Sequence, residues 1–242
     1  MPPKTISTWT RFEVPPLDTI DVSIFKPLIS RRDNYLDALY GRVVESPRDV
    51  MLVVVWKELQ IYDAFVKSAQ HVELLANLKT HSASEPITQI IDFDNVGFCW
   101  RYTQFGHQRR VEIRTVYFPP TISSQTREAV KRLKGLEVTV AHGIDGRRYA
   151  HLCPYDGTPV CGWIYHAQPW NEQDVSACVW SHCWVNEEME RKFKTTERRF
   201  PKTKGGYKPL AVEEFEQQLK DLGALGWEDY HIYFDLVPEE VQ

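Results

Sequence analysis

Two stretches of this chain share one pattern, and that pattern constrains the fold more than any other feature. Met51 to Trp56 is an apolar run of strand length that ends in a tryptophan and leads directly into an amphipathic segment. Ser176 to Trp184 does the same, and in both stretches a phenylalanine comes nine positions after the tryptophan, with a lysine and a hydroxyl residue close behind it. This self-similarity predicts an internal structural repeat.

Composition narrows the classes of protein to consider. The 242 residues suffice for one large domain or two small fused ones, and 43% apolar residues with eight Trp predict a well-packed core. A net charge of −4 argues against nucleic acid or an acidic membrane surface as a partner. No apolar run has the length of a membrane span, and the start lacks an apolar signal core. Five cysteines are an odd, sparse set, which favours reduced thiols and a cytoplasmic protein.

The first half of the chain reads as four strands with helical connections. The strands are predicted over residues 6–14, 39–45, 51–56 and 87–93. Residues 17–34 fit a short helix or an irregular crossover. The helix after Trp56 is predicted to bury one stripe of side chains, made of Tyr62, Phe65, Val66, Ala69 and Val72.

The second half repeats this order with an insertion. Strands are predicted over residues 111–118, 160–166, 176–184 and 229–235. Ser123 or Ser124 caps one predicted helix, a second follows Trp184, and a third covers residues 211–222. Residues 142–158 are rich in Gly, Asp and Pro and are interpreted as an insertion, and residues 98–102 as either connector or an additional strand.

The order strand, crossover, strand, strand, helix, strand is that of the ferredoxin-like fold. We therefore predict an α+β protein with a first ferredoxin-like repeat over residues 1–96, a connector over 97–110 and a second repeat over 111–242. One such sheet leaves a face bare, so two antiparallel sheets are expected to pack together as a pseudo-dimeric α/β barrel with helices outside. Fusion of the repeats predicts a monomer, and a homodimer stays open.

Several segments resemble the dimeric α/β-barrel proteins, and more narrowly the fungal tandem members of the antibiotic-biosynthesis-monooxygenase-like and stress-responsive barrel groups. The resemblance covers roughly residues 6–236, and its motifs are structural ones. The segments that carry it are Tyr40-Gly-Arg-Val-Val-Glu-Ser-Pro47, Val53-Val-Val-Trp56, Phe65-Val-Lys-Ser68, Glu112-Ile-Arg-Thr-Val-Tyr-Phe-Pro119 and Gly162-Trp163.

The resemblance implies a binding site for a hydrophobic or aromatic small molecule between helices and sheet in each repeat, often in secondary metabolism. Members of the superfamily include cofactor-free oxygenases, polyketide cyclases, isomerases, dehalogenases and haem enzymes, so the fold does not fix the reaction. Relatives often carry histidines on the last strand of the repeat. Here the first repeat departs from that pattern with Thr88, whereas the second keeps His231, which favours the second site.

His231 and His182 are the first candidates for acid–base chemistry. His231 is either a hydrogen-bonded strand histidine or a catalytic acid–base group. Strand alternation places His182 on one face with Trp180 and Trp184, where it either orients a planar substrate or belongs to a tryptophan-lined core. Glu112 opens a strand, and because a buried carboxylate needs a partner, an inward Glu112 is either ion-paired or functional.

Further aromatic and polar residues complete the candidate site. Tyr165 is a possible hydrogen-bond donor to a carbonyl or phenol, with ordinary strand packing as the alternative. The residues predicted to bind substrate are Trp184, Trp163, Trp180, His166, Tyr40 and Trp56.

We predict no metal and no cofactor. The chain has no Cys-x2-Cys or His-x3-His pair, no Gly-rich phosphate loop and no nucleophile elbow. The leading hypothesis is a cofactor-independent enzyme that cyclises, rearranges or isomerises a hydrophobic polyketide- or terpenoid-like intermediate. A cofactor-free monooxygenase acting on an aromatic substrate, and a non-catalytic ligand-binding or stress-responsive barrel, are the alternatives.

Overall fold

The structure is a computed structural model that describes residues 5–16, 18–80, 84–93, 110–136, 159–195 and 210–240. The chain divides into two compact units. Unit 1 comprises residues 1–108, 162–166 and 230–242, and unit 2 comprises residues 109–161 and 167–229. The possible strand at 98–102, the insertion at 142–158 and all of the predicted connector except Arg110 lie outside the described residues.

Unit 1 is built on an antiparallel sheet in the order β10-β2-β3-β1-β4. Its strands are β1 (Ile6–Glu13), β2 (Tyr35–Arg42), β3 (Asp49–Trp56), β4 (Ile87–Asp92) and β10 (Asp235–Leu236). The end of β6 (Val160–Ile164) continues the sheet, because Ile164 pairs with Ile91 of β4. All eight residues of β3 are buried, as expected for a central strand that is apolar on both faces.

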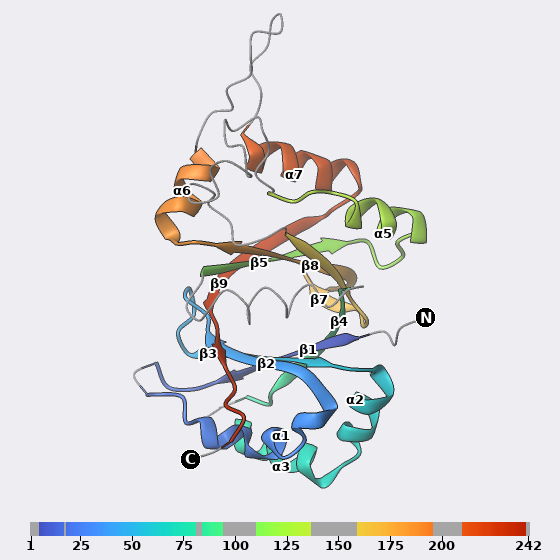
Figure 1. Ribbon diagram of the computed structural model, residues 1–242. Helices are drawn as coiled ribbons and strands as arrows, with labels where there is room; N and C mark the ends of the chain where they lie inside the picture. Colours follow the sequence, from blue (N-terminus) through green and yellow to red (C-terminus); the bar gives the residue numbers. More distant parts are fainter. Residues whose placement is uncertain are drawn as a thin grey trace, which may run out of the picture. The chain divides into compact units, whose positions relative to one another are not determined.

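The helices of unit 1 cover one face of this sheet (Figure 1). They are η1 (Val22–Phe25), α1 (Lys26–Ile29), η2 (Arg32–Asn34), α2 (Leu59–Val66) and α3 (Ala69–Lys79). The single buried stripe predicted after Trp56 is wrong beyond Phe65. The Ser68 side chain accepts from the backbone N–H of His71 and starts a new helix, so the helical phase breaks there. Val72 is consequently 67% exposed, and Leu74 and Leu78 are buried instead.

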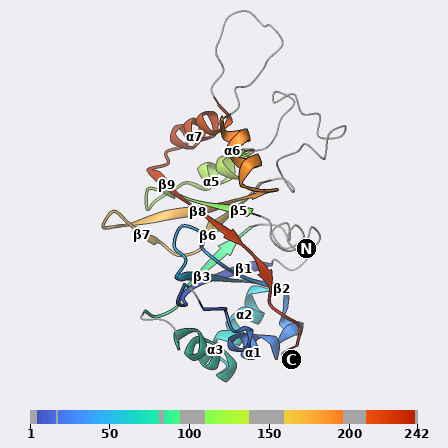
Figure 2. The ribbon, with the colours of Figure 1, turned by 90° about the vertical axis from the view of Figure 1, so that its left-hand side faces the viewer.

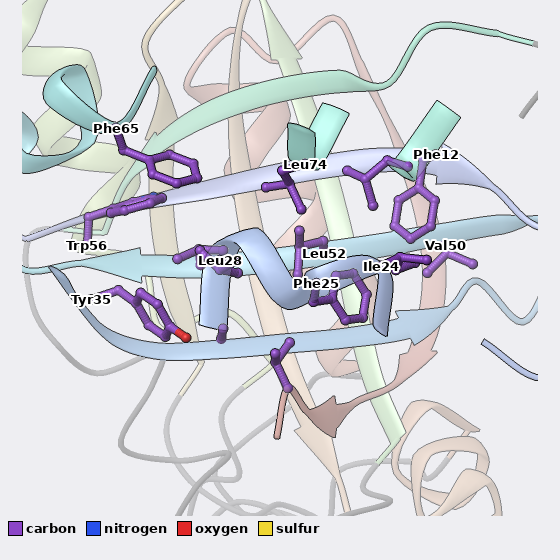
Figure 3. Packing of buried hydrophobic residues seen from close by; sticks show 14 of the residues in the cluster. Phe12, Ile24, Phe25, Leu28, Tyr35, Val50, Leu52, Trp56, Phe65 and Leu74 are labelled. Carbon is purple, nitrogen blue, oxygen red and sulfur yellow. The ribbon is translucent and has the colours of Figure 1, made fainter. Parts of the chain in front are cut away.

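The core between these helices and the sheet is apolar and aromatic. Figure 3 shows Trp56 beside Phe65, with Leu28, Leu52 and Phe25 further along the same cluster. The Trp56 ring lies 4.9 Å from that of Phe65, and the Trp56 Nε1–H donates to the Thr8 hydroxyl at 2.8 Å. Each such aromatic side chain contributes on the order of 2–3 kcal/mol through burial.

Unit 2 contains a second set of antiparallel strands. Its strands are β5 (Arg110–Phe118), β7 (Gln168–Trp170), β8 (Gln173–Trp184) and the first part of β9 (Gly226–Tyr233), with the first residues of β6 next to β8. The β7–β8 hairpin was not predicted from the sequence. It turns at Asn171 and Glu172, which both have positive φ angles of 48° and 63°, and an Asn-Glu pair is a weak turn signal.

Three helices cover one face of the β5–β8 pair, and they are α5 (Ser124–Lys131), α6 (Glu187–Thr195) and α7 (Ala211–Asp221). Figures 1 and 2 show all three on the same side of these two strands. Ser123 caps α5 by accepting from the N–H of Thr126, as one of the two predicted caps. Among the described residues, none of the helices combines the length and the hydropathy that crossing a membrane requires.

The fold is therefore mixed α+β with antiparallel sheets, as predicted. The strand order β2-β3-β1-β4 in the first half and β6-β8-β5-β9 in the second is consistent with the ferredoxin-like order. The predicted domain boundaries and the predicted barrel packing stay predictions.

Candidate functional site

The register of β5 against β8 places three charged residues opposite three aromatic ones. Arg110 pairs with Trp184, Glu112 with His182 and Arg114 with Trp180. Directly opposed residues of an antiparallel pair point to the same face, so all six side chains share one layer, which we call the charged layer. Helices α6 and α7 contact this face, because Phe193 lies 5.4 Å from the Trp184 ring and Phe215 lies 5.1 Å from the Trp180 ring.

The aromatic row of this layer is a nearly parallel stack. The His182 ring lies 6.1 Å from Trp180 at an interplanar angle of 13°, and 6.4 Å from Trp184 at 27°. Phe215 of α7 meets the His182 ring edge-on at 6.0 Å. The stack is almost completely buried, with the three β8 residues at 1% exposure or less. The three rings are therefore held in one nearly parallel arrangement beneath the helices.

The charged row forms a continuous ion-pair network with helix α6. Arg110 donates to Glu190 at 2.7 Å, and the Lys194 ammonium bridges Glu190 at 2.7 Å and Glu112 at 2.9 Å. The Trp184 indole N–H donates to the second Glu112 oxygen at 2.8 Å. Burial opposes the Lys194 charge, but the carboxylates of Glu112 and Glu190 outweigh it and raise the pKa of Lys194. Lys194 therefore stays protonated, and Glu112 is held between two donors.

Arg114 anchors the other end of the row. Its Nε and Nη2 donate to the two Asp229 oxygens at 2.7 and 2.6 Å, and its Nη1 lies 3.4 Å from Glu216. The guanidinium also lies over the rings of Phe215 and Trp227. Burial alone would lower the pKa of Arg114, but Asp229 outweighs it and the pKa is raised. A bidentate, stacked arginine of this kind is fixed in one orientation.

His182 is held neutral in this layer. Burial, followed by the nearby charges of Arg114 and Lys194, lowers its pKa to about 3. Its Nε2 accepts the backbone N–H of Leu136 at 3.2 Å, so the ring proton sits on Nδ1. The loop reaches His182 through Gly135, where φ is +60° and an added Cβ would lie 2.9 Å from Nε2. A histidine with this pKa donates hydrogen bonds at neutral pH but is a weak base.

His231 belongs to unit 1, together with the rest of residues 230–242, whereas the charged layer belongs to unit 2. Its Nδ1 lies 2.5 Å from Glu45 Oε1, and its backbone N–H donates to Glu45 Oε2 at 2.8 Å. Burial would raise the pKa of Glu45, but these hydrogen bonds with His231 lower it overall. No pattern in the sequence links Glu45 to His231, since 186 positions separate them.

The remaining predicted residues are dispersed. Trp56 lies in the helix-side core of unit 1, where the Tyr40 ring contacts Phe25 at 5.1 Å. Trp163 is buried in the part of β6 that belongs to unit 1. Tyr165 is 43% exposed and His166 is exposed as well. Of the predicted candidates, the charged layer thus brings together His182, Glu112, Trp180 and Trp184.

Sequence reasoning did not find four members of this layer and its ion-pair network, namely Arg110, Arg114, Glu190 and Lys194. Glu190 and Lys194 carried a usable signal, because an acid and a lysine four positions apart share one helix face. The arginines alternate with Glu112 along one strand, which places them on the same face. Which face the helices cover was not readable from either pattern.

Comparisons with known proteins place the fold. Neither protein-family models nor curated proteins gave a match. Solved structures do match, among them a "putative monooxygenase" from Lactobacillus acidophilus NCFM, at 9% identity over 96% of this chain and 95% of that chain, with a TM-score of 0.55. An "anthrone oxidase-like protein" matches at 8% identity over 97% and 94%, also with a TM-score of 0.55. A "putative monooxygenase" from Fusobacterium nucleatum matches at 10% identity over 98% and 94%, with a TM-score of 0.52.

Two of these neighbours are named as putative monooxygenases and one as an anthrone oxidase-like protein. The likeness extends over nearly the whole chain and supports the α+β fold that the sequence predicts. At 8–10% identity, the likeness carries no information about which residues act or on what.

Proposed function

We propose that the protein is a cofactor-independent enzyme that processes a hydrophobic small molecule, and that its active site is the charged layer of unit 2. One observation carries the proposal. At the register positions where unit 2 has Arg110, Glu112 and Arg114, unit 1 has Ile6, Thr8 and Thr10, which pair with β3 in the same way. The two units are proposed to be fused ferredoxin-like repeats, of which the second is active.

This difference needs a physical reason. Burying a charged group costs several kcal/mol before it is paired. Replacing a buried ion pair by well-packed apolar residues often leaves the stability of a protein unchanged or raises it. Unit 1 shows that this sheet and its helices form a stable layer without such charges. Buried, precisely paired charges with perturbed pKa values are typical of functional sites, which supports assigning the chemistry to unit 2.

Each member of the layer fits a role in proton-transfer chemistry. Glu112 is the proposed base, because its carboxylate is paired with Lys194 and oriented by Trp184. His182, neutral and protonated on Nδ1, is the proposed hydrogen-bond donor. Trp180 and Trp184 are the proposed walls that align a flat substrate.

The proposed first step is removal of a proton from a carbon next to a carbonyl or within a phenol. The resulting carbanion then cyclises, rearranges or isomerises, as suits a polyketide- or terpenoid-like intermediate of secondary metabolism. Alternatively, it reacts directly with O2, which is the monooxygenase route suggested by the names of the structural neighbours. The site would act in a cytoplasmic monomer or homodimer.

The neighbour named for anthrone oxidase suggests a probe with the required chemistry. Anthrone has an acidic C–H group opposite its carbonyl, and loss of that proton gives an anion that O2 oxidises to anthraquinone and water. Purified protein is incubated with anthrone without added cofactor, while an electrode records O2 uptake and absorbance records anthraquinone. Glu112→Gln should lower the rate by a factor on the order of 10²–10³, the usual effect of losing a general base.

The matched control is Glu188→Gln, which removes an exposed carboxylate from helix α6, the helix that carries Lys194, and should leave the rate unchanged. Circular dichroism establishes that both variants are folded. If anthrone is inert, the metabolites that accumulate in a strain lacking the gene are tested in the same way, and conversion without O2 uptake would identify the isomerase or cyclase route. Equal rates for Glu112→Gln and wild type would refute Glu112 as the base.

A further inference from the structure

Four tryptophans are among the largest fully buried side chains, and one of them differs from the rest in its hydrogen bonding. Three indole N–H groups donate to side chains: Trp9 to Ser7 at 3.0 Å, Trp56 to Thr8 at 2.8 Å and Trp184 to Glu112 at 2.8 Å. The Nε1–H of Trp180 is buried and has no acceptor among the described residues. It belongs to the charged layer, where Trp180 lies opposite Arg114.

A buried N–H without an acceptor is costly. Buried polar groups are bonded in the great majority of cases, and an unbonded one forfeits the hydration that it had in the unfolded chain. A smaller aromatic side chain such as Phe would pack here without a buried donor, so ring packing alone does not explain why an N–H is placed at this position. The natural residue is explained if the acceptor arrives with a ligand.

A second donor lies beside it. Arg114 Nη1 is also buried without a hydrogen bond among the residues that the structure describes, although it forms an ion pair with Glu216 at 3.4 Å. Because Arg114 and Trp180 are directly opposed on β5 and β8, both donors belong to the same face of the sheet. An N–H beside a guanidinium favours an oxygen that carries or develops negative charge.

We infer that Trp180 is a specificity-determining residue, whose indole N–H binds the carbonyl or phenolate oxygen of a flat aromatic substrate, with Arg114 beside it. The rings of Trp180 and His182 are nearly parallel, at 13° to one another, and a flat molecule bound in this layer is proposed to align with them. This inference rests on the proposed function and specifies its substrate class. When the substrate loses a proton, charge grows on the bound oxygen and both donors bind it more strongly.

The resting protein provides the first test, through thermal unfolding of Trp180→Phe and Trp56→Phe. Trp56 is the matched control, because its N–H has a partner in unit 1 and its side chain is equally buried. Trp56→Phe should lower the unfolding midpoint, since it leaves Thr8 without a donor. Trp180→Phe loses the same ring volume but removes an unbonded donor, so its midpoint should fall by clearly less than that of Trp56→Phe.

Binding provides the second test, by equilibrium dialysis of two three-ring probes. Anthrone has a carbonyl oxygen, and 9,10-dihydroanthracene has nearly the same shape without one. Wild type should bind anthrone more tightly, and Trp180→Phe should lose ~5- to 10-fold in anthrone affinity, the value of one hydrogen bond. Its affinity for dihydroanthracene should stay the same, and Trp56→Phe should bind both probes as wild type does.

Two results would overturn the inference while leaving the proposed function intact. One is unchanged anthrone affinity in Trp180→Phe, and the other is a fall in its unfolding midpoint as large as that of Trp56→Phe, because the N–H would then have a partner in the resting protein. Failure of the wild type to bind either probe would also overturn the inference, whereas the proposed function is tested separately by the rates of wild type and Glu112→Gln on the accumulated metabolites.

Discussion

In unit 1 the Trp56 ring lies 4.9 Å from Phe65 and its N–H donates to the Thr8 hydroxyl. In unit 2 the Trp184 ring lies 5.4 Å from Phe193 and its N–H donates to the Glu112 carboxylate. The same strand-to-helix connection thus supports a neutral layer in one unit and an ionised one in the other. The Trp–Phe contact is shared because both units have the same spacing between these two residues. The charge of the layer differs because it depends on the residue that accepts the tryptophan N–H, Thr8 or Glu112, which that spacing does not determine.

Equivalent positions of β3 and β8 differ in what they contribute to stability. Val54 and Leu52 of β3 occupy the register positions that His182 and Trp180 occupy in β8. Aliphatic side chains there contribute burial with no need of partners. The polar side chains that replace them in unit 2 each require a hydrogen-bond partner, and His182 is stable there only as a neutral ring. The number of partners that this layer needs supports the proposal that it serves a function rather than stability.

The largest expected effect is on the free energy of unfolding, when the Glu112 carboxylate of the charged layer is removed. Glu112→Leu leaves the Trp184 N–H without its acceptor and removes one carboxylate from Lys194, so we expect a loss of about 3 kcal/mol in the free energy of unfolding. The matched variant Thr8→Val removes only a neutral hydrogen bond to Trp56 and should cost about 1 kcal/mol. Urea denaturation measures both values. Equal small losses would show that the ion-pair network contributes nothing beyond the neutral layer.

A smaller effect concerns the loss of stability at low pH, which His182 should cause. His182 has an ordinary pKa of 6.5 when unfolded and about 3 when folded, so its contribution to stability is full above pH 6.5 and is lost as the pH falls towards 3. Between pH 6.5 and 5 the loss amounts to about 2 kcal/mol. Urea denaturation at several pH values should show this decline in wild type and not in His182→Gln. An unchanged slope in the variant would assign the acid sensitivity to other groups.

The smallest expected effect concerns the stability of unit 1. This unit contains a buried carboxyl group, Asp37, that has no ion pair among the described residues. Asp37 is 6% exposed and accepts the N–H of Ala38, at 3.0 Å. Burial raises its pKa to about 6, so it favours folding below its unfolded value of 3.8, and stability declines as the pH rises through about 6. Asp37→Asn should therefore be more stable than wild type by ~1–2 kcal/mol at pH 7.5, and by less at pH 4.

Chemical denaturation of the two proteins at both pH values makes this measurement. A variant that is less stable than wild type at pH 7.5 would show that the Asp37 carboxylate has a favourable role. In that case the Asp37 carboxylate would stabilise unit 1 in its charged form, and unit 1 would also contain a favourable buried charge.

Strand patterns predicted most of the fold and part of the site. Alternation along Ser176–Trp184 placed Trp180, His182 and Trp184 on one face, and the register bears this out. The same reasoning failed after Phe65, where Ser68 restarts the helix, and it missed the β7–β8 hairpin. In both places a local hydrogen bond or turn conformation determines the structure, and hydrophobic periodicity does not report either one.

The charged layer was only half predicted for a different reason. A buried charge is recognised by its partner, and the Lys194 ammonium that pairs with Glu112 comes from a helix 82 positions away. Glu45 and His231 are an extreme case of the same difficulty. One sequence shows which residues need a partner, but the choice among distant candidates depends on how the elements dock.

The division of the chain also has a consequence for the order in which the protein is made. Unit 1 begins with the first residues but is completed by the last ones, because Asp235 and Leu236 of β10 pair with Tyr40 and Leu39 on β2. During synthesis, the outer edge of β2 therefore stays without its neighbouring strand until residues 235 and 236 have also been made. An unpaired strand edge is a template for aggregation. Deletion of β10 should thus destabilise unit 1, even though every residue of β1 to β4 is present.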